Sequence, residues 1–472
     1  MVRLWLISLS VAAFAATPLH TTVDLNIGEE QEVKLTDGST ATVKLHYTNT
    51  VKDSTQQAVR AAYAGVEVNG LLLKLGCGNY ELPLMAAGVQ IDCTVSRAYY
   101  ENSNTDHWGL EKDARVRVWP FSSRWLAAGA MIYPVRARWN ASMTQMSNEP
   151  TYVDRGERVT RKKIYYHSGL DIGGAEGLTE VISATDAQVV SLGNEVLAGH
   201  EKETPVAKRY DVIYLLDDRG WYYRYSHLHS FDAEIKLGAR IKQGTRLGLL
   251  GKEGGSGGWS HLHFEIKARQ PSGKWGTEEG YAFLWEAYQR QFSPEVIAVA
   301  RPHRVAALGE KITLDARKSY SPSGRISSYE WSFSGGGKSS EPVVERSYEK
   351  PGTYSEVLKV TSRTGAVAYD FAVINIITAA ETPAIHASFH PSTGIRAGDQ
   401  VTFKVRTFGT TEGEEAWEFG DGSKAATRSD GNVKMHDPNG YAMTRHTYAK
   451  PGDYVVSVRR GDAEAHLWVR VE

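Results

Sequence analysis

Two histidines separated by one residue carry the strongest chemical signal in this 472-residue sequence. His261 and His263 lie in the stretch His-Leu-His-Phe-Glu-Ile. Alternate side chains of a β-strand point to the same face, so both imidazoles would share a face, about 7 Å apart along the strand. Two imidazoles on one face, with a carboxylate and a third histidine from elsewhere, are components of a catalytic zinc site.

Residues upstream could complete such a site. His167 and Asp171 lie four residues apart in His-Ser-Gly-Leu-Asp. Gly169 favours a loop leading into a strand rather than a helix, so the two side chains would converge through a local turn. His227 follows the strand-like run over residues 221–226 and could supply a further imidazole.

Neighbouring polar residues are weaker candidates. Glu265 shares the strand face of the two histidines, where we expect it to support a ligand rather than bind the metal. We expect a surface role for His229, beyond the end of its strand. His200 and Glu201 resemble the start of the helical zinc-protease motif, but its second histidine is absent, so we exclude them.

Alternating and apolar runs predict a mainly β protein. Asp217 to Gly220 is a hairpin turn between strand-like runs at 211–216 and 221–226. A long run over 240–250 leads through a Gly-rich turn, 251–258, into the His261 strand. We expect helices near residues 56–64 and 281–291.

The C-terminal part contains an internal repeat. Tyr-Glu-Lys-Pro-Gly-Thr-Tyr at 348–354 recurs as Tyr-Ala-Lys-Pro-Gly-Asp-Tyr at 448–454, and Trp-Ser-Phe at 331–333 recurs as Trp-Glu-Phe at 417–419. Similar units of about 80–100 residues with short strands predict tandem β-sandwiches. The run Trp-Glu-Phe-Gly-Asp-Gly resembles the signature of the polycystic-kidney-disease-type (PKD) domain. The resemblance implies immunoglobulin-like spacer or adhesion modules.

The central motifs resemble the lysostaphin-type (LytM-like) zinc metallopeptidases, which cut peptidoglycan cross-bridges. Four signals occur in that family's order: His-x-Gly-x-Asp from His167, Tyr-x-His-Leu around His227, a Gly-rich turn, and His-Leu-His-Phe-Glu from His261. The resemblance implies that His167, Asp171 and His263 bind zinc. It also implies that His261 is the general base that activates water, and that His227 orients the water and stabilises the oxyanion.

The chain ends and composition limit the cellular setting. Arg3, an apolar run over 4–12 and a small-x-small site at 13–15 predict a signal peptide over residues 1–16, so we expect a secreted or periplasmic (cell-envelope) protein without a transmembrane anchor. The net charge of −1 gives no global case for nucleic acid as a partner. For an exported protein, Cys77 and Cys93 favour one disulfide.

We therefore predict five segments: a signal peptide (1–16), a β-rich N-terminal domain (17–128), a metallopeptidase domain (129–293) and two PKD-like β-sandwiches (294–379 and 380–472). The predicted function is a zinc endopeptidase acting on peptidoglycan peptides. One alternative is a secreted protease for Gly-rich proteins, with the tail gripping a protein or polysaccharide. The other is a non-catalytic cell-surface binding protein with the same fold.

Overall fold

The computed structural model describes residues 18–55, 57–99, 107–152, 164–378, 383–430 and 440–472. Strands predominate among these residues, with one α-helix, α1 (Tyr281–Phe292), and a short 3-10 helix, Arg97–Tyr99. The prediction of a mainly β fold is confirmed. The predicted signal peptide lies outside the described residues. Within the described ranges, no helix has the length and apolar character needed to cross a membrane.

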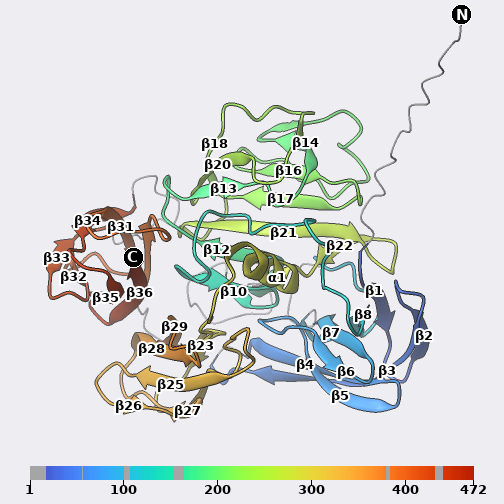
Figure 1. The fold of residues 1–472 in the computed structure, drawn as a ribbon, viewed down its shortest axis with the longest axis horizontal. Helices are drawn as coiled ribbons and strands as arrows, with labels where there is room; N and C mark the ends of the chain where they lie inside the picture. The colour runs from blue at the N-terminus through green and yellow to red at the C-terminus, as the bar shows by residue number, and fades with distance from the viewer. Residues whose placement is uncertain (1–17, 56, 100–106, 153–163, 379–382, 431–439) are drawn as a thin grey trace, which may run out of the picture.

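The N-terminal unit consists of two four-stranded antiparallel sheets, blue to cyan in Figure 1. In spatial order, the first contains β1 (Thr21–Leu25), β8 (Ala114–Pro120), β7 (Val89–Ser96) and β6 (Leu84–Ala86). The second contains β2 (Glu30–Lys34), β3 (Thr40–Lys52), β4 (Val59–Val68) and β5 (Leu71–Gly76). Apolar side chains of both sheets pack in one core.

Two predictions for this unit are wrong. In the segment expected to form a helix near 56–64, residue 56 lies outside the described residues, and residues 59–64 are the start of β4, which pairs with both β3 and β5. Buried Val59, Val66 and Val68 explain the strand, since β-branched side chains pack well on a pleated sheet. Cys77 and Cys93 are free thiols, with Sγ atoms 3.2 Å apart, farther than the ~2.05 Å of a disulfide.

The central unit is built on a long antiparallel sheet, green to yellow in Figure 1. Its main path is β15 (Glu195–Val196), β14 (Ala187–Leu192), β16 (Ile213–Leu216), β17 (Tyr222–Ser226), β21 (His261–Arg269), β12 (Leu170–Gly173) and β9 (Thr144–Gln145). Two flanking strands are β19 (Arg240–Ile241) beside β14 and β22 (Trp275–Glu278) beside β21. Smaller sheets are formed by β13 (Glu180–Ile182), β20 (Arg246–Leu250) and β18 (Leu228–Phe231), and by β10 (Pro150–Tyr152) and β11 (Ile164–Tyr166).

Most of the expected elements of this unit are confirmed. The hairpin joins β16 to β17, and α1 begins at Tyr281 as predicted. Phe283 and Trp285 of α1 pack in the same core as Phe264 of β21, so the helix supports the strand that carries the histidine pair. The run over 240–250 is divided into β19 and β20 by a turn in which Gly244 has φ +83°.

The two tail units are β-sandwiches with separate cores, as predicted, and one sheet of each joins edge to edge, through the single parallel pair Thr353 and Ala463, into one nine-stranded sheet. The path of this sheet is β23 (Arg304–Ala306), β29 (Val367–Ile376), β28 (Gly352–Ser362), β36 (Ala463–Val471), β35 (Gly452–Arg460), β32 (Glu415–Glu418) and β33 (Lys424–Thr427). Off this path, β25 (Ile326–Ser332) pairs with β28, and β26 (Lys338–Ser339) pairs with β25. The opposing layers are β24 (Ile312–Asp315) with β27 (Val343–Arg346), and β30 (Ala384–His390), β31 (Gln400–Phe408) and β34 (Ala442–Thr447). Trp331 and Trp417 are buried in the two cores.

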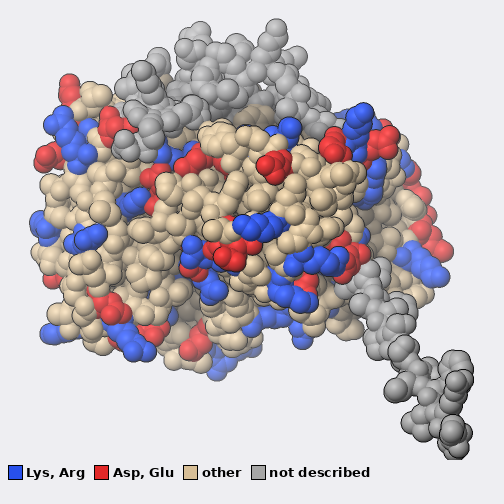
Figure 2. Space-filling model, turned by 90° about the horizontal axis from the view of Figure 1, so that it is seen from above, with Lys and Arg blue, Asp and Glu red and all other residues tan. Residues whose placement is uncertain are grey.

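The units are packed against one another. In Figure 1 the second tail unit, red, lies beside the start of β21, while the first, orange, lies next to the blue N-terminal unit. Arg138 of the central unit stacks on Trp468 of β36, 3.9 Å from the ring centroid. On the described surface that Figure 2 shows, basic and acidic side chains are interspersed, without a large area of one sign.

Candidate metal centre and active site

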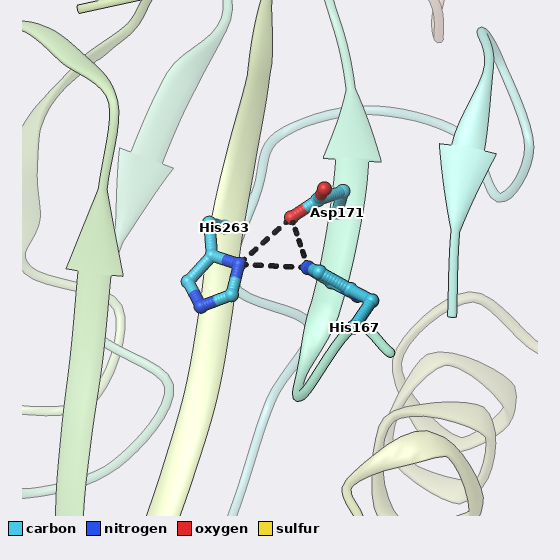
Figure 3. A group of neighbouring side chains, drawn as sticks. All are labelled: His167, Asp171 and His263. Atoms are coloured by element: carbon cyan, nitrogen blue, oxygen red, sulfur yellow. Dashed lines mark hydrogen bonds and ion pairs between the residues drawn. The ribbon is translucent and has the colours of Figure 1, made fainter. Parts of the chain in front are cut away.

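Two adjacent strands position three of the predicted site residues. β12 pairs with β21 so that Asp171 lies opposite His263 and Gly173 lies opposite His261. His167 precedes a turn at Gly169, whose φ is +82°, and the turn directs its imidazole back towards Asp171 (Figure 3). A Cβ atom at Gly169 would lie 2.7 Å from the carbonyl oxygen of Phe264, so this close approach requires glycine.

Three donor atoms converge in this turn. His167 Nε2 lies 3.0 Å from His263 Nδ1 and 3.1 Å from Asp171 Oδ1, and His263 Nδ1 lies 2.9 Å from the same oxygen. Tetrahedral zinc with bonds of about 2.05 Å would place its ligand atoms about 3.3 Å apart. The observed triangle is slightly smaller than that, so small movements would accommodate the ion. The donor set of two imidazoles and one carboxylate is suited to zinc.

The remaining ring nitrogens fix the direction of the two imidazoles. His167 Nδ1 faces the carbonyl oxygen of Met146 at 3.3 Å, so Nδ1–H donates outward and Nε2 presents its lone pair to the centre. His263 Nε2 faces Glu265 Oε2 at 3.7 Å, which leaves Nδ1 for the centre. The hydrogen bond to Met146 sets the tautomer of His167, whereas Glu265 acts on His263 by its charge, at a distance too long for a hydrogen bond.

The charges of the triangle favour an ionised carboxylate. Burial alone would raise the pKa of Asp171, but His167 and His261 hold that pKa well below its usual value. The pKa of His167 is raised because Asp171 outweighs the effect of burial. All three side chains are buried, so water screens these interactions only weakly.

His261 and His227 lie on one side of the triangle. Their ring centroids are 4.7 Å apart, and His261 Nε2 lies 3.4 Å from Asp171 Oδ2. His261 Nδ1 faces the carbonyl oxygen of Trp259 at 3.1 Å, so Nδ1 carries the proton and Nε2 is free to accept one. Burial lowers the pKa of both histidines, which favours the neutral form that a base requires.

The sequence of the central unit matches a known family. The profile of peptidase family M23 matches residues 165–274, and profiles of the PKD domain match residues 293–376 and 385–472. The chain carries an M23 peptidase domain followed by two PKD domains. The M23 match includes all five predicted site residues: His167, Asp171, His227, His261 and His263.

Individual relatives cover parts of the chain. The catalytic domain of the antimicrobial peptidase lysostaphin from Staphylococcus simulans is 20% identical, over 31% of this chain and 94% of that one, with a TM-score of 0.22. Whole lysostaphin is 15% identical over 54% of this chain and 96% of that one, with a TM-score of 0.25. Collagenase ColA of Clostridium perfringens is 27% identical over 158 residues, 33% of this chain, and the match spans 14% of the collagenase.

The M23 domain contains supporting residues that the motifs did not reveal. Asp211 Oδ2 accepts the backbone N–H of His227 at 2.9 Å and holds this residue in a left-handed conformation, φ +67°. The carbonyl oxygen of Glu253 lies 2.5 Å from His227 Nδ1, while Arg209 Nη2 lies 3.2 Å away. Because the carbonyl only accepts and its contact is the shorter one, His227 Nδ1 carries the proton. These residues lie outside the histidine motifs. The one signal for them in the sequence is Asp211, an acidic residue just before the apolar run that forms β16.

The structure also shows where the weaker candidate residues lie relative to the donor triangle. Glu265 is buried, accepts a hydrogen bond from Thr277 at 2.8 Å and faces His263, consistent with a supporting role. His229 is exposed beside Glu253, and His200 contacts the hydroxyl group of Tyr222 at 3.0 Å, away from the donor triangle. The Gly-rich turn supplies the carbonyl of Glu253 to His227, so it contributes through its backbone.

Proposed function

We propose that this protein is an exported zinc endopeptidase that hydrolyses peptide bonds in peptidoglycan cross-links or stem peptides. The M23 match makes the central domain a peptidase domain. The observation that carries the proposal is the convergence of His167 Nε2, Asp171 Oδ1 and His263 Nδ1 within 3.1 Å of one another. The signal-like residues 1–16 support export.

The residues around the triangle would divide the work of hydrolysis. Bound zinc would polarise the scissile carbonyl and bring the pKa of a water molecule towards neutrality. His261 accepts the water's proton at Nε2, because Trp259 holds the other nitrogen protonated. His227, with Nδ1–H donated to Glu253, accepts a hydrogen bond from the water at Nε2 and so orients it. The hydroxyl group of the resulting tetrahedral adduct keeps its remaining proton directed at His227 Nε2, which stabilises the adduct and its oxyanion, and His261 passes the proton that it accepted to the leaving amine.

The test compares three full-length proteins on isolated peptidoglycan sacculi: the wild type, His261→Ala and the control His229→Ala, which changes an exposed histidine. We expect the wild type and His229→Ala to release muropeptides and bind one zinc ion. We expect His261→Ala to keep zinc but to lose at least about 100-fold in activity, as for removal of a general base. Full activity of His261→Ala, or a wild type without zinc, would contradict the mechanism.

The same preparations separate the alternatives. Cleavage of an elastin-like Gly-rich protein without muropeptide release would favour a secreted protease for such proteins. Binding to sacculi without cleavage of either substrate would favour a non-catalytic surface protein. Muropeptide release with an intact Gly-rich protein is the outcome that the proposal predicts.

A further inference from the structure

The segment that leads into the catalytic strand is held by the second PKD domain. Arg406, on β31, donates from Nη1 to the carbonyl oxygen of Gly258 at 2.7 Å. Tyr441, just before β34, accepts the backbone N–H of Ser260 on its hydroxyl oxygen at 2.8 Å. Residues 258–260 directly precede His261, so two contacts from the tail act on the backbone at the start of β21.

A directed chain of hydrogen bonds also connects Tyr441 to Ser142 of the central unit. Ser142 donates its hydroxyl proton to the carbonyl oxygen of Ala387 at 2.6 Å, so it accepts from His386 Nε2, 3.1 Å away. His386 Nδ1 is then unprotonated and accepts the hydroxyl proton of Tyr441 at 2.6 Å. Consequently the oxygen of Tyr441 has a lone pair for the N–H of Ser260. Burial lowers the pKa of His386 to about 3, which keeps this tautomer neutral.

Trp259 transmits the position of this segment to His261. Its ring stacks on the imidazole with centroids 3.9 Å apart and an interplanar angle of 26°. On the tail side the same ring lies 5.3 Å from the ring of His386. The carbonyl oxygen of Trp259 also accepts the Nδ1–H of His261. A shift of residues 258–260 would therefore turn the imidazole and change the direction of its Nε2 lone pair.

The M23 domain also holds this segment itself. The hydroxyl group of Ser260 donates to the carbonyl oxygen of Gly174, and the backbone N–H of His261 donates to the carbonyl oxygen of Gly251 at 3.0 Å. Lys404 of the tail donates to the carbonyl oxygen of Glu176 at 2.7 Å, two residues after Gly174. The start of β21 is therefore fixed from two domains at once.

We propose that the second PKD domain is a positioning part of the catalytic unit, in which Tyr441 and Arg406 fix the backbone of residues 258–260 and thereby the orientation of His261. This inference rests on the proposed peptidase function. It assigns the tail a role in the chemical step, in addition to any role in binding the substrate. Orientation matters for such a base because misplacement of a reacting group by about 1 Å can cost about 100-fold in rate.

The test uses the full chain with Tyr441→Phe, which removes one hydroxyl group and keeps the ring. We expect kcat to fall about tenfold, with KM nearly unchanged and zinc fully retained, because orientation of the base is altered and substrate binding is not. Amide hydrogen exchange of a peptide covering residues 256–262 should become faster. Tyr454→Phe is the matched control, since that hydroxyl group donates to the carbonyl oxygen of Lys450, elsewhere in the same domain.

A second variant tests the same role independently, in case Tyr441→Phe does not fold. Arg406→Lys keeps the charge for Asp430 but lacks the planar fork that also reaches Gly258, so a fall in kcat in the same direction is expected. An active wild type with an equally active Tyr441→Phe overturns the positioning role, even if exchange is faster. If the wild type itself is inactive, that result contradicts the proposed function and therefore also this inference.

Discussion

His263 and Asp171 lie directly opposite each other on β21 and β12, with Nδ1 of the histidine 2.9 Å from Oδ1 of the aspartate. Opposed residues of an antiparallel pair have Cβ atoms about 4.5–5.5 Å apart, so the sheet itself brings these two donor atoms together. Only His167 depends on a turn. The sheet register is thus the main geometric determinant of the proposed metal site.

Asp171→Asn should weaken zinc binding by at least about 100-fold, because it removes the anionic donor of the triangle while keeping its shape; losing only an outer partner costs about 10–100-fold. Competition with a chelator measures the affinity. Asp218→Asn is the matched control, since Asp218 is exposed and pairs with Arg240. Equal zinc affinity of Asp171→Asn and wild type would show that Asp171 is not a ligand.

Glu265→Gln should lower zinc affinity by about tenfold, because the carboxylate behind His263 increases the basicity of that ligand. The replacement has nearly the same volume and can still accept a hydrogen bond from Thr277. The same chelator competition is the measurement, and Glu330→Gln, at a partly exposed position on β25, is the control. An unchanged affinity would reduce Glu265 to a packing role.

Gly169→Ala and Gly220→Ala separate backbone strain from crowding. Both glycines have positive φ, +82° and +83°, so each alanine should cost about 1–2 kcal/mol in the free energy of unfolding. Only at Gly169 would the added Cβ meet neighbouring atoms, at 2.7 Å, whereas nothing lies within 4 Å at Gly220. We expect a larger drop in the thermal midpoint and weaker zinc binding for Gly169→Ala alone. Similar zinc affinity in both variants would argue against the turn as a determinant of the site.

A buried ion-pair network between the N-terminal unit and the central unit should make stability depend on acid pH. Arg117 of β8 donates to Glu278 of β22 at 2.7 Å, and His20 lies 3.3 Å from the same carboxylate. Burial opposes ionisation of Glu278, but His20 and Arg117 outweigh it and lower its pKa from 4.5 to about 2. The folded pKa is below the unfolded one, so this stabilisation is complete above the unfolded pKa and is lost as the pH falls towards the folded value.

Thermal unfolding of wild type and Glu278→Gln between about pH 6 and about pH 3 checks this linkage. The difference between their midpoints should be largest at the upper end, where removing the charge leaves Arg117 without one of its buried partners, and should shrink on acidification. A difference that is constant over the range would show that the carboxylate does not titrate as described.

Local sequence was sufficient for the strands and for the residues of the donor triangle. Alternation placed His261 and His263 on one strand, and Gly169 indicated the turn that brings His167 towards Asp171. Side-chain direction in a strand repeats every two residues, so short patterns carry this information. Where the local signal was ambiguous, as in the Ala- and Gln-containing segment near β4, pairing with two neighbouring strands decided against a helix.

The sequence by itself determined the mainly β fold through local periodicity, and it determined the order of the M23 and PKD modules and the candidate site residues through short motifs that resemble those of known families. Only the tertiary structure decided which nitrogen of each histidine faces the centre, and that Tyr441 and Arg406 reach the backbone before His261. Those contacts join residues far apart in the chain. They depend on how whole domains pack, which no local pattern encodes.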